Sequence, residues 1–225
     1  MTTQRTDIFR DIVGQRRATR GFLEKEVPQD TLEEIFELAQ RAPSNCNTQP
    51  WQIAVVSGQR CRQLAEGFHT AMEQGNIDMD FTYDGVYHGK YRDRQHAAAS
   101  ALYNAMGIPR EDKTARHRAF MRNFTFFDAP HVAFFFLPEP FGIREAADLG
   151  MYAQTLMLTL TAYGLASCPQ TALSFQAHIV RGELDIDDNR KLLFGLSFGY
   201  PNPEHPSNCC RTEREAIAGV VRFYR

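Results

Sequence analysis

Two short polar stretches near the N-terminus hold the side chains best suited to chemistry. The first is Arg16-Arg17-Ala18-Thr19-Arg20, with three guanidinium groups in five residues, and the second is Pro43-Ser44-Asn45-Cys46-Asn47-Thr48-Gln49-Pro50-Trp51, a run of amides and hydroxyls. Guanidinium groups bind phosphate through charge-assisted, often bidentate hydrogen bonds. Amides offer donors and acceptors without charge. Together the two stretches predict a binding site for a small anionic ligand.

Each stretch also has a plainer interpretation. The arginines alone would be typical of a solvated basic turn at a helix end. The second stretch, called here the amide loop (residues 43–51), would alone be a polar connection, but it holds more polar side chains than a short connection needs. The net charge of -2 lacks the basic excess of nucleic-acid-binding proteins, so we expect one small anion and no nucleic-acid partner.

The neighbouring elements are predicted from hydrophobic spacing. Apolar residues at helical intervals indicate a helix over Thr6–Gly14, ended by the glycine, so the arginines follow a helix end. A second helix begins near Thr31, where Thr31-Leu32-Glu33-Glu34 resembles a capping box, and ends near Ala42. The apolar run Trp51–Ser57 predicts a buried strand directly after the amide loop.

The rest of the chain mixes helices and strands, which favours an α+β fold in a single domain over residues 1–225. Helices are predicted over 59–72, 92–106, 111–123 and 144–163, and strands over 131–137, 166–172 and 191–200. The helix over 144–163 is the longest and most apolar, so we expect it in the centre of the molecule. Residues 75–110 form a substrate-side excursion, and residues 201–225 form a C-terminal extension that reaches a partner subunit.

Several common sites are not supported by the sequence. There is no GxGxxG, HExxH or GxSxG pattern, so we predict no Rossmann site, no metal and no serine triad. Five cysteines without a CxxC pair indicate reduced thiols and a cytoplasmic location. The polar N-terminus is not that of a signal peptide, and no apolar run reaches membrane-spanning length.

Taken together, the arginine cluster after a first helix, the amide loop leading into a strand and the late Arg211 resemble the FMN-dependent nitroreductase family. The resemblance runs nearly end to end, and Asn123–Pro130 and Ser167–Ala172 are also similar. It implies a nitroreductase-like α+β fold with a central mixed sheet, in an intertwined homodimer whose C-terminal arm reaches the partner. It also implies FMN as cofactor, NADPH or NADH as reductant, and ping-pong hydride transfer to a nitroaromatic or similar electron-poor small molecule.

The resemblance also implies a role for each residue of the site. Arg16, Arg17 and Arg211 would bind the FMN phosphate, with Ala18 beside them, and Arg20 would lie at the N1 and C2 edge of the flavin ring. The segment Gln170-Thr171-Ala172 would approach N5 through its backbone, Pro169 would cover one ring face, and Asn123 would reach the pyrimidine edge. The amide loop would serve the flavin of the other subunit, through Pro43, Ser44, Asn45, Asn47 and Gln49. No side-chain acid or base is required.

Two positions depart from the family pattern. Cys209 stands where the family often has a cation, and Thr171 stands where an acidic residue is sometimes found. Three alternatives remain open at this level: the same flavin scaffold reducing quinones or enones, removing halogen or cleaving flavin; a non-catalytic flavin-binding protein; and a small anion- or RNA-binding module.

Other conspicuous residues have simpler expected roles. Trp51 is expected as a core anchor, Cys46 as a small buried residue and Asp148 as a helix cap. Tyr83, Tyr87 and Tyr91 are expected either as a lid over the flavin or as surface residues.

Overall fold

A four-stranded antiparallel sheet lies at the centre of the chain. The structure is a computed structural model that describes residues 2–225, with the backbone alone at residues 2 and 3. The strands follow the order β1-β2-β4-β3 and are β1 (Gln52–Ser57), β2 (His131–Pro138), β3 (Ala166–Gln170) and β4 (Arg190–Gly199). The α+β class is confirmed. The expected mixed sheet is not: every strand pair is antiparallel, because each strand enters at the end where its neighbour finishes. The parallel contacts among the described residues are two isolated bridges, Ala18 with Ser167 and Asp78 with Gln176.

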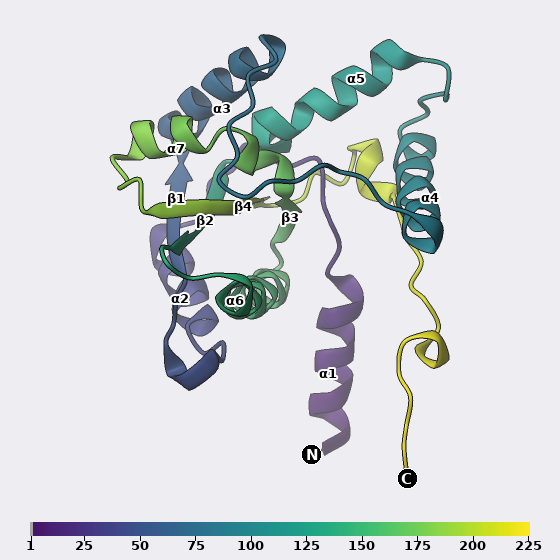
Figure 1. Cartoon of the computed structure of the whole chain (residues 1–225). Helices are drawn as coiled ribbons and strands as arrows, with labels where there is room; N and C mark the ends of the chain where they lie inside the picture. Colours follow the sequence, from purple (N-terminus) through teal and green to yellow (C-terminus); the bar gives the residue numbers. More distant parts are fainter. Residues whose placement is uncertain (1) are drawn as a thin grey trace.

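Helices cover both faces of this sheet (Figure 1). The helices α3 (Gly58–Glu73) and α7 (Ala177–Leu184) lie on one face, and α2 (Gln29–Ala39) and α6 (Ile143–Ala162) lie on the other. The strand β2 shows why its sequence is apolar without interruption. Phe134 and Phe136 face the core under α3, whereas Phe135 faces the core under α2 and α6. A strand buried on both faces needs apolar residues at every position.

The helix α6 is the longest of the described elements, as predicted, with 20 residues. Its expected place in the centre of the molecule is wrong. Leu149, Leu156 and Leu160 pack against the sheet, but Met151 on another side of the helix is 40% exposed. The helix is therefore an outer layer of this subunit, and its first residue, Ile143, is also exposed.

The remaining helices stand outside the layered core. They are α1 (Thr2–Gln15), α4 (Gly89–Ala105) and α5 (Lys113–Met121). In Figure 1 α1 projects away from the sheet, and the chain beyond β4 passes beside α4 so that both termini lie at the same end. That C-terminal segment forms two short 3-10 turns, η4 (Pro206–Cys209) and η5 (Ile217–Gly219), and residues 211–225 are exposed.

Three local predictions differ from the structure. No capping box precedes α2, because the helix already begins at Gln29 and Thr31 lies inside it. The strand predicted to reach Ala172 ends at Gln170, where the chain turns into the 3-10 segment η3 (Thr171–Phe175). The helix α7 was not predicted at all, since its eight residues are too few to establish a periodicity.

No helix in the described part of the chain is both long enough and apolar enough to cross a bilayer.

Candidate functional site

The arginine cluster runs along the free edge of β3. After α1 ends, the N–H of Thr19 donates to the carbonyl of Ser167 at 3.0 Å, and Ala18 forms the parallel bridge with the same residue. This pairing brings residues 16–20 beside the first half of β3, and Arg17 and Thr19 line a cavity together with Leu165 and Ala166. At the other end of the strand, alternation leaves Pro169 exposed while Gln170 points inward, and Thr171 directly after it is exposed.

Arg17 and Arg211 lie close enough for their charges to act on each other. Burial and the positive charge of Arg211 lower the pKa of Arg17, which the sulfur of Cys209 partly offsets. The Arg211 side chain donates to the carbonyls of Asn208 and Cys210, both at 2.9 Å. Within the described residues no carboxylate forms an ion pair with either arginine. Two interacting cations that no carboxylate of the described residues neutralises would suit a phosphate group, to which guanidinium groups donate charge-assisted hydrogen bonds.

Asn123 and Gln170 are hydrogen-bonded to each other. Gln170 Nε2 donates to the carbonyl of Asn123 at 3.0 Å and to its Oδ1 at 3.2 Å, and Gln170 Oε1 accepts from the hydroxyl of Ser197. Asn123 Nδ2 donates to the carbonyl of Phe120 at 2.8 Å. Both amides therefore tie the end of β3 to the segment η2 (Arg122–Asp128). The side chain of Gln170 is therefore used within the fold.

The amide loop has a strained backbone. Its centre is the 3-10 turn η1 (Asn45–Asn47), and Cys46, Asn47 and Gln49 have φ of 49°, 56° and 48°. Positive φ is uncommon for residues other than glycine and clusters at ligand sites, where surrounding contacts hold it. One such contact is Ser44 Oγ, which accepts from the N–H of Gln49 at 2.9 Å.

The loop presents its polar side chains to solvent. Asn45, Asn47 and Gln49 are exposed, and so is Cys46, which corrects the expectation of a small buried residue. The left-handed turn explains the difference, because it directs the side chains of this short loop away from the core. These amides are thus exposed to a ligand or another chain, although Gln49 Nε2 also donates to the carbonyl of Asn47 at 3.2 Å within the loop.

Asp148 holds the amide loop from α6. The helix is capped instead by Glu145, whose carboxylate accepts from the N–H of Gly142 at 3.0 Å, so the expected capping role of Asp148 is wrong. Asp148 is buried, with 4% of its surface exposed, and its carboxylate accepts from the N–H of Asn45 at 3.1 Å. A buried carboxylate aimed at a backbone N–H is a positioning device for the loop.

Trp51 fixes the other end of the loop, and its predicted role as a core anchor is confirmed. Its ring is buried against Tyr152, with centroids 5.0 Å apart, and its Nε1 donates to Gln40 Oε1 at 2.9 Å. Because Tyr152 and Asp148 lie one turn apart on α6, this helix supports both ends of the amide loop.

The predicted site residues therefore form two sets. The first, called here the arginine face, brings together the arginine cluster, the end of β3 and two residues from elsewhere in the chain: Arg16, Arg17, Ala18, Arg20, Asn123, Pro169, Gln170, Thr171, Ala172 and Arg211. The second is the amide loop with Pro43, Ser44, Asn45, Asn47 and Gln49, held between α2 and α6. In Figure 1 the loop beyond α2 and the segment beyond α1 are drawn apart. No hydrogen bond among the described residues joins the two sets directly.

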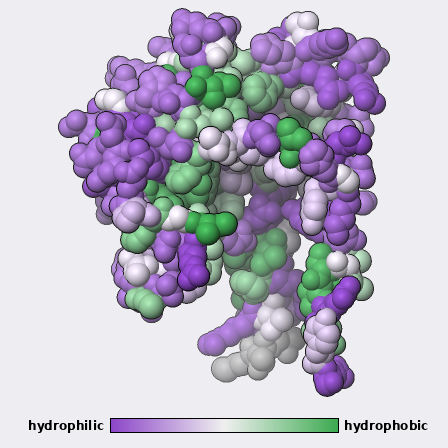
Figure 2. Space-filling view, viewed as in Figure 1, coloured by the Kyte–Doolittle hydropathy of each residue, from purple (hydrophilic) through white to green (hydrophobic). Residues whose placement is uncertain are grey.

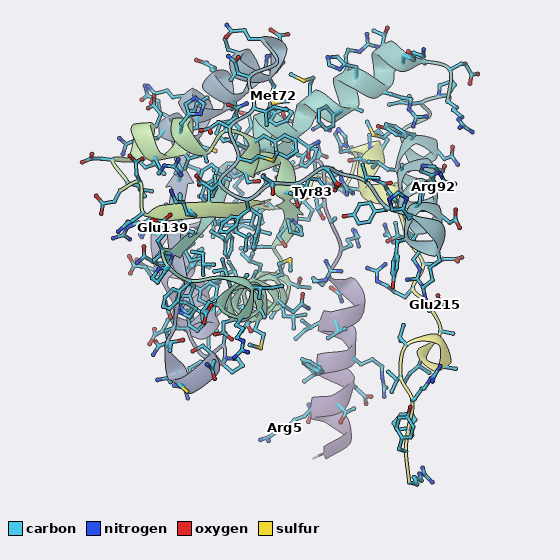
Figure 3. The ribbon with its side chains drawn as sticks, in the orientation of Figure 1. Arg5, Met72, Tyr83, Arg92, Glu139 and Glu215 are labelled. Atoms are coloured by element: carbon cyan, nitrogen blue, oxygen red, sulfur yellow. The ribbon has the colours of Figure 1, made fainter. Side chains whose placement is uncertain are left out.

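The excursion begins with firm anchors. Asp78 forms a parallel bridge with Gln176, and the carboxylate of Asp80 accepts from the N–H of Leu192 at 2.7 Å and from Arg181 at 2.5 Å. Beyond these anchors the chain crosses toward α4, and Figure 3 shows Tyr83 midway along that crossing. The hydroxyls of Tyr83 and Tyr87 lie 3.3 Å apart, and this hydrogen bond raises the pKa of Tyr83.

Three residues that support the backbone of the arginine face, directly or through one another, were not predicted: Arg122, His205 and Asn208. Asn208 Oδ1 accepts from the N–H of Arg20 at 2.8 Å, and Arg122 donates to the carbonyl of Arg20 at 2.9 Å. These contacts join residues more than a hundred positions apart. No local pattern in one sequence carries such a signal.

Comparisons with known proteins agree with this geometry. Residues 13–200 match the model of the Nitroreductase family. The chain is 44% identical over 215 residues to Nitroreductase NfnB of Mycolicibacterium smegmatis, covering 95% of this chain and 92% of that protein. It is 33% identical to a 4-nitrobenzoate reductase of Pseudomonas putida, over 97% and 96% of the two chains. The crystal structure of the FMN-dependent nitroreductase NfnB from Mycobacterium smegmatis in complex with NADPH is similar with a TM-score of 0.94 at 43% identity, covering 98% of this chain and 99% of that one.

Proposed function

The chain belongs to the nitroreductase family, and we propose that it is an FMN-dependent oxidoreductase that passes hydride from NADPH to nitroaromatic or similarly electron-poor small molecules. The observation that carries the proposal is the arginine cluster held along the free edge of β3, where the positive charges of Arg17 and Arg211 act on each other and no carboxylate of the described residues forms an ion pair with either. Relatives named for FMN, NADPH and 4-nitrobenzoate supply the chemistry that this arrangement would serve.

The residues of the arginine face fit FMN. Arg16, Arg17 and Arg211 would bind its phosphate, and Arg20 would place positive charge at the pyrimidine edge of its ring. The exposed Pro169 would pack on one face of the ring, and the backbone of Thr171 and Ala172, directly after β3, would lie at its reactive edge. FMN, when bound, supplies the atom that accepts and returns the hydride.

The protein's own part in the reaction is then binding and orientation. None of the residues that define the arginine face is an aspartate, glutamate or histidine. We therefore assign no side chain as a general acid or base. Donor and acceptor would bind in turn at the same position beside the flavin. Binding there would hold each reacting atom close to the flavin and correctly oriented, which lowers the activation barrier. Sharing of one place by two substrates corresponds to ping-pong order.

The proposal includes a homodimer in which each flavin is bound by both subunits. The side chains of the amide loop are exposed, and Figure 1 draws the loop apart from the segment beyond α1, so a second copy would bring the two sets together. Exposed apolar side chains support this arrangement: Ile8 and Phe9 of α1 are 54% and 60% exposed, and Phe223 of the C-terminal segment is 77% exposed. Figure 2 shows hydrophobic surface over these two parts. Such surface marks protein interfaces.

One spectrum tests the cofactor assignment. Purified protein, or protein incubated with FMN and desalted, should show flavin absorbance, and anaerobic NADPH should bleach it. NADH in a parallel titration measures the coenzyme preference, and a panel of nitrobenzoates, quinones, enones and halophenols separates nitroreduction from the other flavin reactions. A colourless protein that gains no flavin band contradicts the proposal. Flavin that is bound but not bleached by either coenzyme indicates a non-catalytic flavin-binding protein.

The cytoplasmic location expected from the cysteine content stays part of the proposal, and the five cysteines of the structure are free thiols. Fractionation of cells that express the tagged protein tests it.

A further inference from the structure

The backbone of Arg20 and Gly21 depends on side chains from distant parts of the chain. The preceding residue, Thr19, still pairs with β3, but Arg20 and Gly21 lie beyond the sheet edge. The N–H of Arg20 donates to Asn208 Oδ1 at 2.8 Å, and its carbonyl accepts from Arg122 at 2.9 Å. The carbonyl of Gly21 accepts from Asn208 Nδ2 at 2.8 Å. The position of Arg20 is thus set by two side chains, one on each side of the backbone.

Asn208 is well suited to this role. It is buried, and its amide makes three hydrogen bonds, because Nδ2 also donates to the carbonyl of Asn202 at 2.8 Å. Its orientation is determined by these partners, since an N–H must face the oxygen and the carbonyls must face the nitrogen. A buried amide with all these bonds made is a rigid support.

Arg122 is in turn held by a histidine. Its guanidinium lies 2.7 Å from His205 Nε2 and donates to Asp128 at 2.7 Å. Because arginine is always protonated, we assign Nε2 as the acceptor of a neutral ring. Nδ1 lies 2.7 Å from Ser207 Oγ and 3.3 Å from the backbone nitrogen of Ser207. The ring also packs directly on the supported backbone: a Cβ built at Gly21 would lie 2.3 Å from His205 Cγ.

Protonation of His205 would remove this acceptor and place a second positive charge against Arg122. The charged groups that act on the ring are Arg122 and Asp128. Burial and Arg122 lower the pKa of His205, and Asp128 opposes them only in part. The ring is therefore neutral at neutral pH and becomes charged on acidification.

We propose that Arg122, His205 and Asn208 are positioning residues that hold the backbone of Arg20, and that protonation of His205 releases this hold. The inference rests on the proposed function for its effect on FMN, because Arg20 is the residue assigned to the pyrimidine edge. Weakening the support should loosen FMN as the pH falls.

The first test compares FMN dissociation constants, from quenching of flavin fluorescence, between about pH 8 and pH 5. The wild type should lose about tenfold more affinity over this range than His205→Gln, whose amide oxygen accepts from Arg122 without titrating. The ionisation of the FMN phosphate, with a pKa of about 6, affects both proteins equally and cancels in the comparison. The matched control His69→Gln, on α3 beside Glu73, should follow the wild type.

The result that overturns the inference is a pH dependence of His205→Gln parallel to that of the wild type. A wild type that binds no FMN at any pH contradicts the proposed function instead. In that event amide hydrogen exchange in the protein without FMN decides the inference. The Arg20 N–H should lose at least about tenfold protection in Asn208→Ala but keep it in the control His69→Gln, whose position on α3 makes no hydrogen bond to this support. Equal protection of the Arg20 N–H in all three proteins would contradict the inference. If Asn208→Ala does not fold, protection of the Arg20 N–H is instead measured in the wild type and in His205→Gln between about pH 8 and pH 5. It should fall on acidification in the wild type only, and an equal fall in both proteins would contradict the inference.

Discussion

The carboxylate of Asp148, in the second turn of α6, accepts a hydrogen bond from the backbone N–H of Asn45 at 3.1 Å. This bond joins the buried layer of the core to a loop that carries three non-glycine residues at positive φ. Contacts of this kind hold the strained backbone of the amide loop in place. The exposure of the side-chain amides therefore depends on Asp148, which contacts the backbone of Asn45. A loop that is already rigid avoids the entropic cost of becoming ordered when flavin binds.

Replacing Asp148 should therefore weaken FMN binding from a distance. Asp148→Ala removes a charge-assisted hydrogen bond, and we expect FMN to dissociate about tenfold faster. Asp148→Asn keeps an oxygen of the same shape and should lie near the wild type. The rate of FMN release after dilution into apoflavodoxin or another flavin trap measures both. Equal release rates for Asp148→Ala and wild type would show that the bond does not position the loop.

The amides of the loop should themselves contribute to flavin retention. The double substitution Asn45→Ala with Asn47→Ala should weaken FMN binding, because two groups offered to the flavin are lost. Since Asn47 has a φ of 56°, where alanine is strained, Asn47→Gly serves as the control that removes the amide without the strain. Unchanged FMN affinity of the double variant in an intact dimer would reduce the loop to a structural connection.

Inorganic phosphate should stabilise the protein when FMN has been removed. A phosphate ion that bridges Arg17 and Arg211 relieves their mutual repulsion, and a ligand that binds only the folded state raises the melting temperature. We expect Tm to rise with phosphate in the wild type and to stay level in Arg17→Ala with Arg211→Ala, at constant ionic strength. Differential scanning fluorimetry measures this, with chloride as the reference salt. An equal phosphate response in the double variant would place the anion elsewhere.

His131 should make the stability of the fold depend on pH. Its buried ring accepts the N–H of Val27 at Nε2, 2.9 Å away, lies with Nδ1 2.6 Å from Ser57 Oγ, and stacks on Phe198. Burial lowers its pKa, which Glu26 partly opposes. The unfolded chain therefore binds a proton first, near the ordinary pKa of about 6.5, and the stability present above that pH is lost as the pH falls toward the folded pKa.

Urea unfolding between about pH 7.5 and pH 5 measures this contribution. The free energy of unfolding should fall by up to about 1.4 kcal/mol per pH unit more in the wild type than in His131→Gln, which cannot take up the proton. Because His131→Gln is expected to be less stable at neutral pH, the comparison is between the slopes of the unfolding free energy against pH. His117→Gln, at an exposed position, is the control. Identical slopes in His131→Gln and wild type would contradict a role for this ring.

Much of the fold could be predicted from local patterns. The helix over 59–72, the apolar strand over 131–137 and the long helix over 144–163 each have a strong periodicity or a continuous apolar run, and all three are present. Elements without such a signal were not predicted. The helix α7 is only eight residues long, and η3 replaces the end of a predicted strand because the chain turns at Thr171.

The site was predictable only in part, for a similar reason. The arginines and amides are recognisable because they are clustered in sequence, and in the structure residues 16–20 lie along the free edge of β3. The residues that position them are single side chains far away in sequence, such as Asp148 for Asn45 and Asn208 for Arg20. Long-range pairs of this kind are set by tertiary packing, and one sequence holds no periodicity that indicates them.

Subunit complementation tests the central claim most directly, namely that each flavin site uses the arginine face of one subunit and the amide loop of the other. Arg211→Ala and Asn45→Ala with Asn47→Ala are each expected to give dimers with weak FMN binding. Unfolding and refolding the two variants together at equal amounts should restore tight sites to about a quarter of the wild-type number, since half of the dimers would be mixed and each would hold one undamaged site. The number of tight sites is counted by FMN titration, with each variant refolded alone as control. Recovery to about a quarter is the predicted result, and mixed dimers with no tight site at all would show that each subunit builds its site alone.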